Sequence, residues 1–226
     1  MKMLRFLSAL LMVAGLFAMT GCSSFDFHNP TADEWNVQIV GDSVFDLSGD
    51  IRTVLKSLSG KGYKDRSVSG AKIAAIDSQL ATALTRTTLK TVIADGGAND
   101  ILQGTMDCNT DPLTQGCIDV VDYVGDKMEN MLDDMYVKGL DDACVWLGYY
   151  HVKGAELEKN EAIDYCYTNA YPAIFGSSPV EAHLVDPRPY IFPIHIKSDD
   201  IHPTYDGSVI LANMIWNTLV ANNIYR

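Results

Sequence analysis

The residue types that could carry catalytic chemistry lie in four short segments of this sequence, far apart along the chain. In the first, "WNVQIVGDSVFDLSG", Ser43 follows an apolar run, so its hydroxyl group is expected where a buried strand ends. A serine at such a turn can attack an ester carbonyl when a base accepts its proton and donors stabilise the resulting oxyanion. Gly-Asp-Ser is also ordinary turn chemistry. Ser43 is therefore a candidate nucleophile whose role depends on partners elsewhere.

The base is expected to be a histidine, because an imidazole is largely neutral near pH 7 and can accept a proton. His202 is the best placed, since Pro203 holds it extended just before a predicted helix. Asp199 lies three residues earlier, so its carboxylate can fold back to accept a hydrogen bond from Nδ1 of His202. Asp200 is the alternative partner, although we expect it to face solvent. The other histidines are interpreted as tether or structural residues: His28, His151, His183 and His195.

Donors for an oxyanion are available in two further segments. The backbone N–H groups of Ser43 and Gly70 are candidates, since glycine permits a close backbone approach. The side-chain amide of Asn99 is a third candidate, because it donates without carrying a titrating charge. Taken alone, Gly70 reads as a turn residue and Asn99 as a helix cap. No Gly-x-Ser-x-Gly segment occurs, so the nucleophile elbow of the α/β-hydrolases does not apply.

Strand-like and helix-like patterns alternate along the chain. Apolar or β-branched runs occur in "NVQIVG", "YKDRSVSG", "TLKTVIADGG", "ACVWLGYYHV" and "AHLVD". Helical spacing occurs in "GDIRTVLKSLSG", "AKIAAIDSQLATAL", the segment after Cys117, "ELEKNEAIDYCYTNAY" and "TYDGSVILANMIWNTLVANN". The methionine-rich stripe after Cys117 is interpreted as core. The alternation predicts one domain with a parallel sheet and helices on both faces. Ligands bind beyond the carboxyl ends of such strands, where Ser43, Gly70 and Asn99 are expected.

The segments "GDSVFDLSG", "SVSGAK", "GGAND" and "SDDIHPT" resemble, in this order, the four signature blocks of the SGNH (GDSL) hydrolase family. The resemblance covers most of the chain from Val37 to Thr204. It implies a flavodoxin-like three-layer α/β/α fold with a five-stranded parallel sheet, and hydrolysis of esters or thioesters. By this resemblance, Ser43 is expected to be the nucleophile, and Asp199 and His202 complete the triad. Gly70 and Asn99 are expected to help form the oxyanion hole. The cysteine-bearing insert around residues 105–117 lies outside the shared pattern, and we expect it to shape the acyl pocket.

Residues 1–21 look like a secretory signal peptide rather than part of the fold. Lys2 and Arg5 precede an apolar run that is too short to span a bilayer comfortably. Cys22 follows directly and resembles the lipidated cysteine of bacterial lipoproteins, with a plain cleaved signal as the alternative. We therefore predict a membrane anchor in the cell envelope, at the outer membrane, and this division of the chain: signal peptide 1–21, lipidated tether 22–34 and hydrolase domain 35–226.

The charge of the chain excludes some partners. The net charge is −12, and it becomes −14 without residues 1–21, because they carry Lys2 and Arg5 but no acidic residue. Nucleic acids and anionic lipids are bound by clustered Lys and Arg. We therefore expect no nucleic-acid partner, and membrane attachment through the lipid anchor rather than through a basic patch.

Four cysteines remain besides Cys22, and an even number in an exported chain suggests two disulfides. Four cysteines allow three pairings, and proximity in sequence favours Cys108–Cys117 and Cys144–Cys166. A zinc site is the alternative, but no Cys-x-x-Cys spacing occurs and no histidine lies within a few residues of these cysteines.

The sequence predicts a serine esterase that acts on short-chain carboxylic esters, or on lysophospholipids or thioesters, without a metal or organic cofactor. The lean towards short acyl chains rests on the lack of a long insertion that could form a large lid. Two alternatives remain open. One is a carbohydrate O-deacetylase of the same family, and the other is a surface-binding lipoprotein without turnover.

Overall fold

The computed structural model describes residues 32–140 and 143–226. The predicted signal peptide, the lipidation site Cys22 and most of the predicted tether lie outside the described residues. Within the described part, no helix combines the length and apolar character that a membrane crossing requires.

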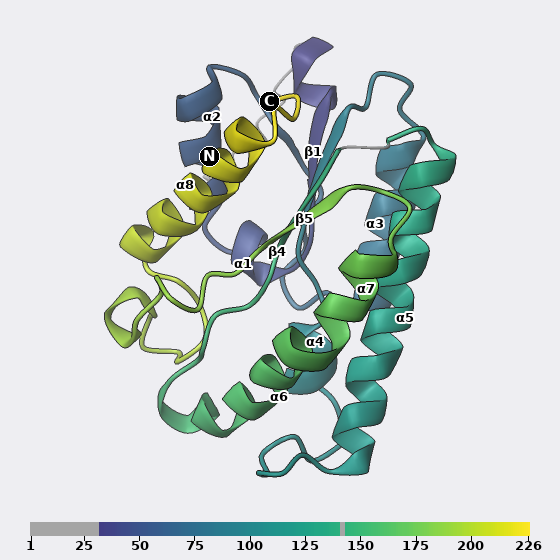
Figure 1. Cartoon of the computed structure of the whole chain (residues 1–226). Helices are drawn as coiled ribbons and strands as arrows, with labels where there is room; N and C mark the ends of the chain where they lie inside the picture. The colour runs from purple at the N-terminus through teal and green to yellow at the C-terminus, as the bar shows by residue number, and fades with distance from the viewer. Residues whose placement is uncertain (1–31, 141–142) are drawn as a thin grey trace, which may run out of the picture.

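A five-stranded parallel sheet forms the centre of the molecule (Figure 1), with strand order β2-β1-β3-β4-β5. This is the flavodoxin-like order, so the predicted fold class is confirmed. Every residue of β1, β3 and β4 is buried, which explains why these strands read as continuous apolar runs. The edge strand β2 has only two half-buried residues, fewer than its segment predicted. The strands are β1 (Val37–Val40), β2 (Lys64–Asp65), β3 (Thr91–Ala94), β4 (Cys144–Leu147) and β5 (Ala182–Val185).

Long helices cover both faces of the sheet (Figure 1). One face packs against α3 (Ile73–Leu84), α5 (Gln115–Val137) and α7 (Tyr171–Ser177), and the other against α2 (Asp50–Ser59) and α8 (Tyr205–Ala221). Trp146 of β4 belongs to the first apolar cluster, whereas its neighbour Val145 belongs to the second. Because successive strand residues point to opposite faces, each buried strand contributes to both halves of the core.

Shorter elements lie at the carboxyl end of the sheet, where the candidate site residues are expected. The helices α1 (Ser43–Asp46) and α4 (Ala98–Leu102) follow β1 and β3. The sequence predicted one helix after β4, but the structure divides this segment. It consists of a 3-10 turn η2 (Gly154–Lys159), α6 (Asn160–Tyr165), a π-helical turn η3 (Cys166–Ala170) and then α7.

The cysteines confirm one predicted disulfide and exclude the other. Cys108 and Cys117 are bonded, with 5.1 Å between their Cα atoms. The predicted bond between Cys144 and Cys166 is wrong, because both thiols are free. Cys144 begins β4, whereas Cys166 lines a cavity beyond the other end of that strand. A four-residue strand spans roughly 10–13 Å, well beyond the reach of a disulfide between residues at its two ends.

Candidate active site

The turn after β1 holds Ser43 at the carboxyl end of the sheet. Asp42 caps α1, because its Oδ1 accepts a hydrogen bond from the Val44 N–H at 3.0 Å. The Asp42 N–H in turn donates to Oδ1 of Asp95 at 2.8 Å. A Cβ atom at Gly41 would collide with the same Asp95 oxygen, so only glycine lets the chain pass this close. The position of Ser43 is therefore fixed from both sides of the turn.

The structure brings His202 and Asp199 to Ser43, although 159 residues separate His202 from the serine. Nε2 of His202 lies 2.8 Å from Oγ of Ser43, and Nδ1 of His202 lies 2.9 Å from Oδ2 of Asp199. The other Asp199 oxygen accepts the backbone N–H groups of Ile201 and His202 at 3.1 and 2.9 Å. This is the geometry of a hydroxyl beside a base, with the base oriented by a carboxylate.

The loop that carries Asp199 also keeps it ionised. Partial burial raises the pKa of the Asp199 carboxyl, but the hydrogen bonds from the backbone and side chain of His202 outweigh that effect. The pKa therefore lies below its ordinary value. An ionised carboxylate at this place accepts the Nδ1–H of His202 and leaves Nε2 facing Ser43.

Asp200, the alternative partner of His202, has a different function in the loop. Its backbone takes a left-handed conformation with φ of 67°, which turns its carboxylate away from His202. Oδ2 of Asp200 accepts the N–H of Ala155 at 3.1 Å, and its carbonyl accepts the N–H of Lys153. Asp200 is half-buried, and through these two bonds it connects this loop to the segment after β4.

Asn99 lines the same cavity as Ser43, and Gly70 is joined to Asn99 by Gln103, a residue that the sequence did not single out. Gly70 has a φ of +79°, and its carbonyl accepts Nε2 of Gln103 at 3.3 Å. The same Gln103 nitrogen donates to Oδ1 of Asn99 at 2.8 Å. Nδ2 of Asn99 donates to the Ala71 carbonyl at 3.1 Å and to Oδ2 of Asp42 at 3.3 Å. Both N–H groups of the Asn99 amide are thus engaged, and the longer contact is the one to Asp42.

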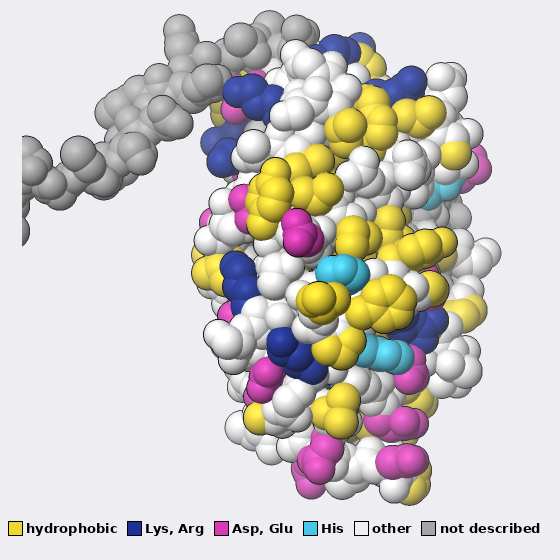
Figure 2. Space-filling view, turned by 90° about the vertical axis from the view of Figure 1, so that its left-hand side faces the viewer, with side chains coloured by type: hydrophobic (Ala, Val, Ile, Leu, Met, Phe, Trp, Pro, Cys, Tyr) yellow, Lys and Arg dark blue, Asp and Glu magenta, His cyan; other side chains and the backbone are white. Residues whose placement is uncertain are grey.

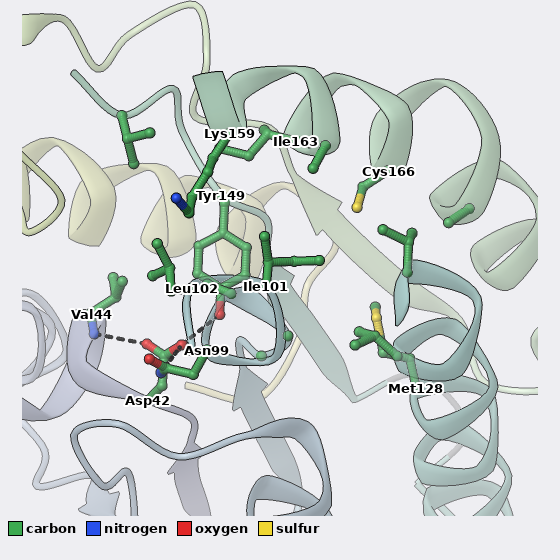
Figure 3. Close-up of a pocket in the computed structure, with 18 of the residues that line it drawn as sticks. Asp42, Val44, Asn99, Ile101, Leu102, Met128, Tyr149, Lys159, Ile163 and Cys166 are labelled. Atoms are coloured by element: carbon green, nitrogen blue, oxygen red, sulfur yellow. Dashed lines mark hydrogen bonds between the residues drawn. The ribbon is translucent and has the colours of Figure 1, made fainter. Parts of the chain in front are cut away.

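Two buried groups behind the serine were missed at the sequence level. Tyr149, which follows β4, donates from its hydroxyl to Oδ2 of Asp42 at 2.7 Å (Figure 3). Burial raises the pKa of Asp42, although hydrogen bonds from Val44 and Tyr149 act against this. Burial, followed by the charge of Asp42, holds the pKa of Asp95 well above its ordinary value. An acidic residue directly after the apolar run of β3 was the available signal for Asp95.

From the raised pKa of Asp95 we predict how the stability of the fold changes with pH. Oδ2 of Asp95 has no hydrogen-bond partner in the described structure, so the ionised carboxylate is stabilised only by the Asp42 N–H at Oδ1. A raised folded-state pKa means that the folded state binds this proton more tightly than the unfolded state. Asp95 therefore contributes most to the free energy of unfolding below about pH 4, and this contribution is lost as pH rises through the folded-state pKa.

We expect Asp95→Asn to be more stable than the wild type at pH 7, with the advantage shrinking towards pH 4. The asparagine keeps the acceptor for the Asp42 N–H but cannot ionise. Urea denaturation at pH 4, 5.5 and 7 measures the effect, and Asp122→Asn on the exposed face of α5 is the matched control. A stability difference that does not change with pH would contradict this account of Asp95.

The residues that the structure describes contain no group of three or more His, Cys, Asp or Glu side chains placed to hold a metal ion.

Comparison with known proteins identifies the fold. No family model matches the sequence, and no curated protein matches it. Among the solved structures that match, TesA is 20% identical with a TM-score of 0.59, over 82% of this chain and 98% of that one. A family 3 carbohydrate esterase from Talaromyces cellulolyticus is 14% identical with a TM-score of 0.63, over 82% and 96% of the two chains. A proposed SGNH hydrolase from Slackia heliotrinireducens is 15% identical with a TM-score of 0.61, over 81% and 97%. The chain therefore has an SGNH-like α/β fold.

Proposed function

We propose that this protein is a serine esterase of the SGNH hydrolase family that cleaves carboxylic esters through an acyl-enzyme. The observation that carries the proposal is the hydrogen-bonded series from Ser43 Oγ to His202 Nε2 and from His202 Nδ1 to Asp199, at 2.8 and 2.9 Å. It lies at the carboxyl end of a fold shared with carbohydrate esterases of low sequence identity. A side-chain hydroxyl has no need of this arrangement for structure alone.

The proposed reaction begins when His202 accepts the Ser43 proton at Nε2 as Oγ attacks the ester carbonyl. The tetrahedral intermediate then collapses, and His202 delivers the proton to the leaving alcohol oxygen. Water attacks the acyl-enzyme in the second half of the reaction, again with His202 as the base. Asp199 stays ionised throughout and stabilises the imidazolium that forms.

Stabilisation of the oxyanion is assigned to the N–H groups of Ser43 and Gly70 and to the amide of Asn99. The Asn99 amide can turn one N–H to the oxyanion by giving up its 3.3 Å contact with Asp42. Asp42 Oδ2 does not lose its only partner in this exchange, because the Tyr149 hydroxyl still donates to it at 2.7 Å. Tyr149 is therefore a positioning residue of the proposed site, since it frees Asn99 to act.

A carbohydrate O-deacetylase is the second candidate function. It is favoured by the structural likeness to the carbohydrate esterase from Talaromyces cellulolyticus and to a family 3 carbohydrate esterase of Clostridium thermocellum, which is 18% identical with a TM-score of 0.59. A binding lipoprotein without turnover is disfavoured, because a binder has no use for the Ser43–His202–Asp199 arrangement. In either case we propose attachment to the cell envelope through Cys22, on the basis of the signal-like residues before it.

Parallel assays separate these functions. We expect the purified protein to hydrolyse p-nitrophenyl acetate and to react covalently with a fluorophosphonate probe. Acetate release from acetylated xylo-oligosaccharides is measured in parallel. The ratio of kcat/KM for these sugars to kcat/KM for p-nitrophenyl acetate then distinguishes a deacetylase from a general esterase. The absence of both turnover and labelling would leave the binding function as the better proposal.

A further inference from the structure

An apolar cavity leads away from Ser43 into the molecule (Figure 3). It runs between α4 and α5 on one side and α6, η3 and α7 on the other, and with the solvent at its mouth it has a volume of about 910 Å³. Asp42 and Asn99 lie at one end, and Ser43, which directly follows Asp42, also lines the cavity. Figure 3 places Cys166 and Met128 at the opposite side, away from Asp42 and Val44.

The walls of this cavity are largely apolar, and many of the residues that line it are aliphatic. Side chains from four elements contribute: Ile101, Val124, Met128, Ile163 and Ile174. The methionine-rich stripe of α5, interpreted from the sequence as core, thus serves two purposes. Met131, Leu132 and Met135 are packed in the core, whereas Val121, Val124 and Met128 also line the cavity. A cavity with apolar walls that extends from Ser43 to residues of α5 and η3 suits an aliphatic chain longer than an acetyl group.

Two local features shape the walls of the cavity. Gly125 lies inside the long helix α5, where glycine is unfavourable for helix stability. A Cβ atom at Gly125 would lie 3.3 Å from Cδ1 of Ile174, so glycine lets α7 pack closely on α5 here, and a larger side chain would push against Ile174 at the cavity wall. On the opposite wall, Cys166 and Ala170 begin and end the π-helical turn η3, and both line the cavity. Such turns are rare and often occur at functional sites.

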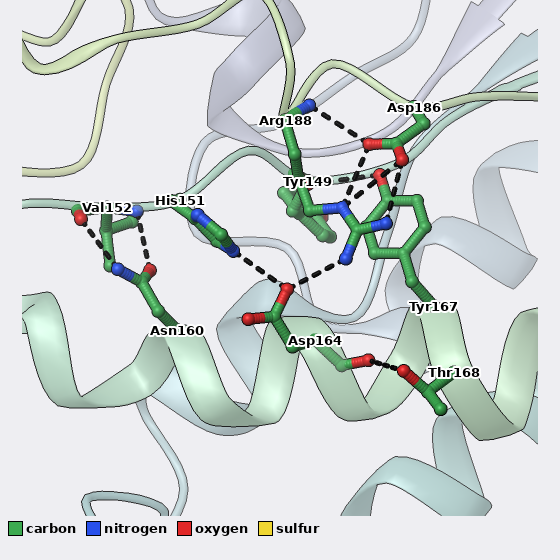
Figure 4. Close-up of polar contacts among 9 residues, drawn as sticks. All are labelled: Tyr149, His151, Val152, Asn160, Asp164, Tyr167, Thr168, Asp186 and Arg188. Carbon is green, nitrogen blue, oxygen red and sulfur yellow. Dashed lines mark hydrogen bonds and ion pairs between the residues drawn. The ribbon is translucent and has the colours of Figure 1, made fainter.

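Polar contacts fix the wall formed by α6 and η3 (Figure 4). Oδ1 of Asp164 in α6 accepts Nε2 of His151 and Nη1 of Arg188, each at 2.8 Å. Arg188 also binds Asp186 after β5 and stacks on the Tyr167 ring, with 3.6 Å from its guanidinium carbon to the ring centre. The wall is thereby attached to the loops that follow β4 and β5. The cavity is part of the folded framework rather than a gap between loose segments.

The disulfide supports the wall from the outside. Cys108 and Cys117 form a small apolar cluster with Ala162, and Ile101 packs against it. Ala162 and Ile101 both line the cavity. The insert around residues 105–117 therefore contacts the wall of the cavity through these two side chains.

We propose that this cavity binds the acyl chain of medium- or long-chain aliphatic esters or thioesters, with the carbonyl at Ser43 and the chain end near Met128 and Cys166. The proposal rests on the proposed function, because it takes Ser43 as the acylated residue. It replaces the expectation of short acyl chains. That expectation relied on the lack of a lid insertion, whereas this cavity is formed by α5 and by the segment between β4 and β5.

The first test compares p-nitrophenyl acetate, butyrate, octanoate and decanoate. In the wild type we expect kcat/KM to rise with chain length, by up to about fourfold for each methylene that enters the cavity. Gly125→Leu should lower the decanoate-to-acetate ratio of kcat/KM by at least about tenfold. Glu129→Leu adds the same side chain on the exposed face of α5 and should keep the wild-type ratio. Cys166→Phe, on the opposite wall, should act like Gly125→Leu.

The second test does not need catalysis. The Ser43→Ala protein should bind the fluorescent fatty acid cis-parinaric acid, decanoate should displace it, and Gly125→Leu in the same background should weaken binding at least about tenfold. The acyl-pocket proposal would be overturned if the protein hydrolysed p-nitrophenyl acetate but bound no fatty acid. It would also be overturned if neither Gly125→Leu nor Cys166→Phe changed the decanoate-to-acetate ratio of kcat/KM. Either result would leave the esterase proposal intact. Binding without hydrolysis of any ester would instead overturn the esterase proposal.

Discussion

Ser43→Ala should lower kcat/KM for p-nitrophenyl esters by about 10⁶-fold, close to the rate without nucleophilic catalysis. The reason is that no second hydroxyl occupies the position 2.8 Å from Nε2 of His202 in the described structure. The same substitution should abolish covalent labelling by a fluorophosphonate probe. Both measurements need only the purified protein, and neither depends on the natural substrate.

The structure offers a matched control for this substitution. Ser57 lies on the exposed face of α2, and its hydroxyl donates only to the Thr53 carbonyl one turn earlier. Ser57→Ala should leave turnover and labelling at the wild-type level. Persistent labelling of Ser43→Ala would mean that another serine is the nucleophile, and it would remove the basis of the proposed function. Because Ser43 begins a short helix at the surface end of β1, its replacement should leave the fold intact.

The fold was predictable because each buried strand is marked locally. The runs VQIV, TVIA and CVWL are apolar at every position or nearly so, which is typical of strands covered on both faces. The same local signals place Ser43 and Asn99 directly after strands. The four short blocks then predicted which segments meet, and the structure does bring Ser43 and His202 within hydrogen-bond distance.

The contacts between strands were not predictable in the same way. The hydrogen bond from Tyr149 to Asp42 joins the ends of β4 and β1, and the contact between Asp42 and Asp95 joins β1 and β3. Neither residue pair has a spacing that marks it in the sequence. For Cys144 and Cys166, proximity along the chain led to a wrong disulfide prediction. Cys144 begins β4, whereas Cys166 lies in η3, beyond the other end of that strand.

The cavity was missed for a related reason. The sequence predicted one helix over residues 156–171, whereas one wall of the cavity is formed by α6, η3 and α7, and apolar periodicity does not reveal a π-helical turn. Residues on that segment, such as Ile163 and Ile174, have the spacing of ordinary core positions. Only the three-dimensional arrangement of α5 and this segment shows that these residues line a cavity.

Asp199→Asn should lower kcat by about 10⁴-fold while changing KM little. The carboxylate accepts the Nδ1–H of His202 at 2.9 Å, whereas an asparagine amide can present a donor there and favour the imidazole tautomer that carries its proton on Nε2. That tautomer cannot accept the Ser43 proton. The pKa of Asp199 is held below its ordinary value, so this loss should be constant across the neutral pH range.

Asp200→Asn is the control that decides which carboxylate orients the base. Its Oδ2 accepts the Ala155 N–H, and an asparagine oxygen can accept the same bond, so kcat should remain near the wild-type value. Stopped-flow measurement of acyl-enzyme formation from p-nitrophenyl acetate, made on both variants, compares the two residues directly. If Asp200→Asn loses activity and Asp199→Asn retains it, the loop must rearrange when substrate binds. If Asp199→Asn alone is impaired, the 2.9 Å contact seen without substrate is the one that operates during catalysis.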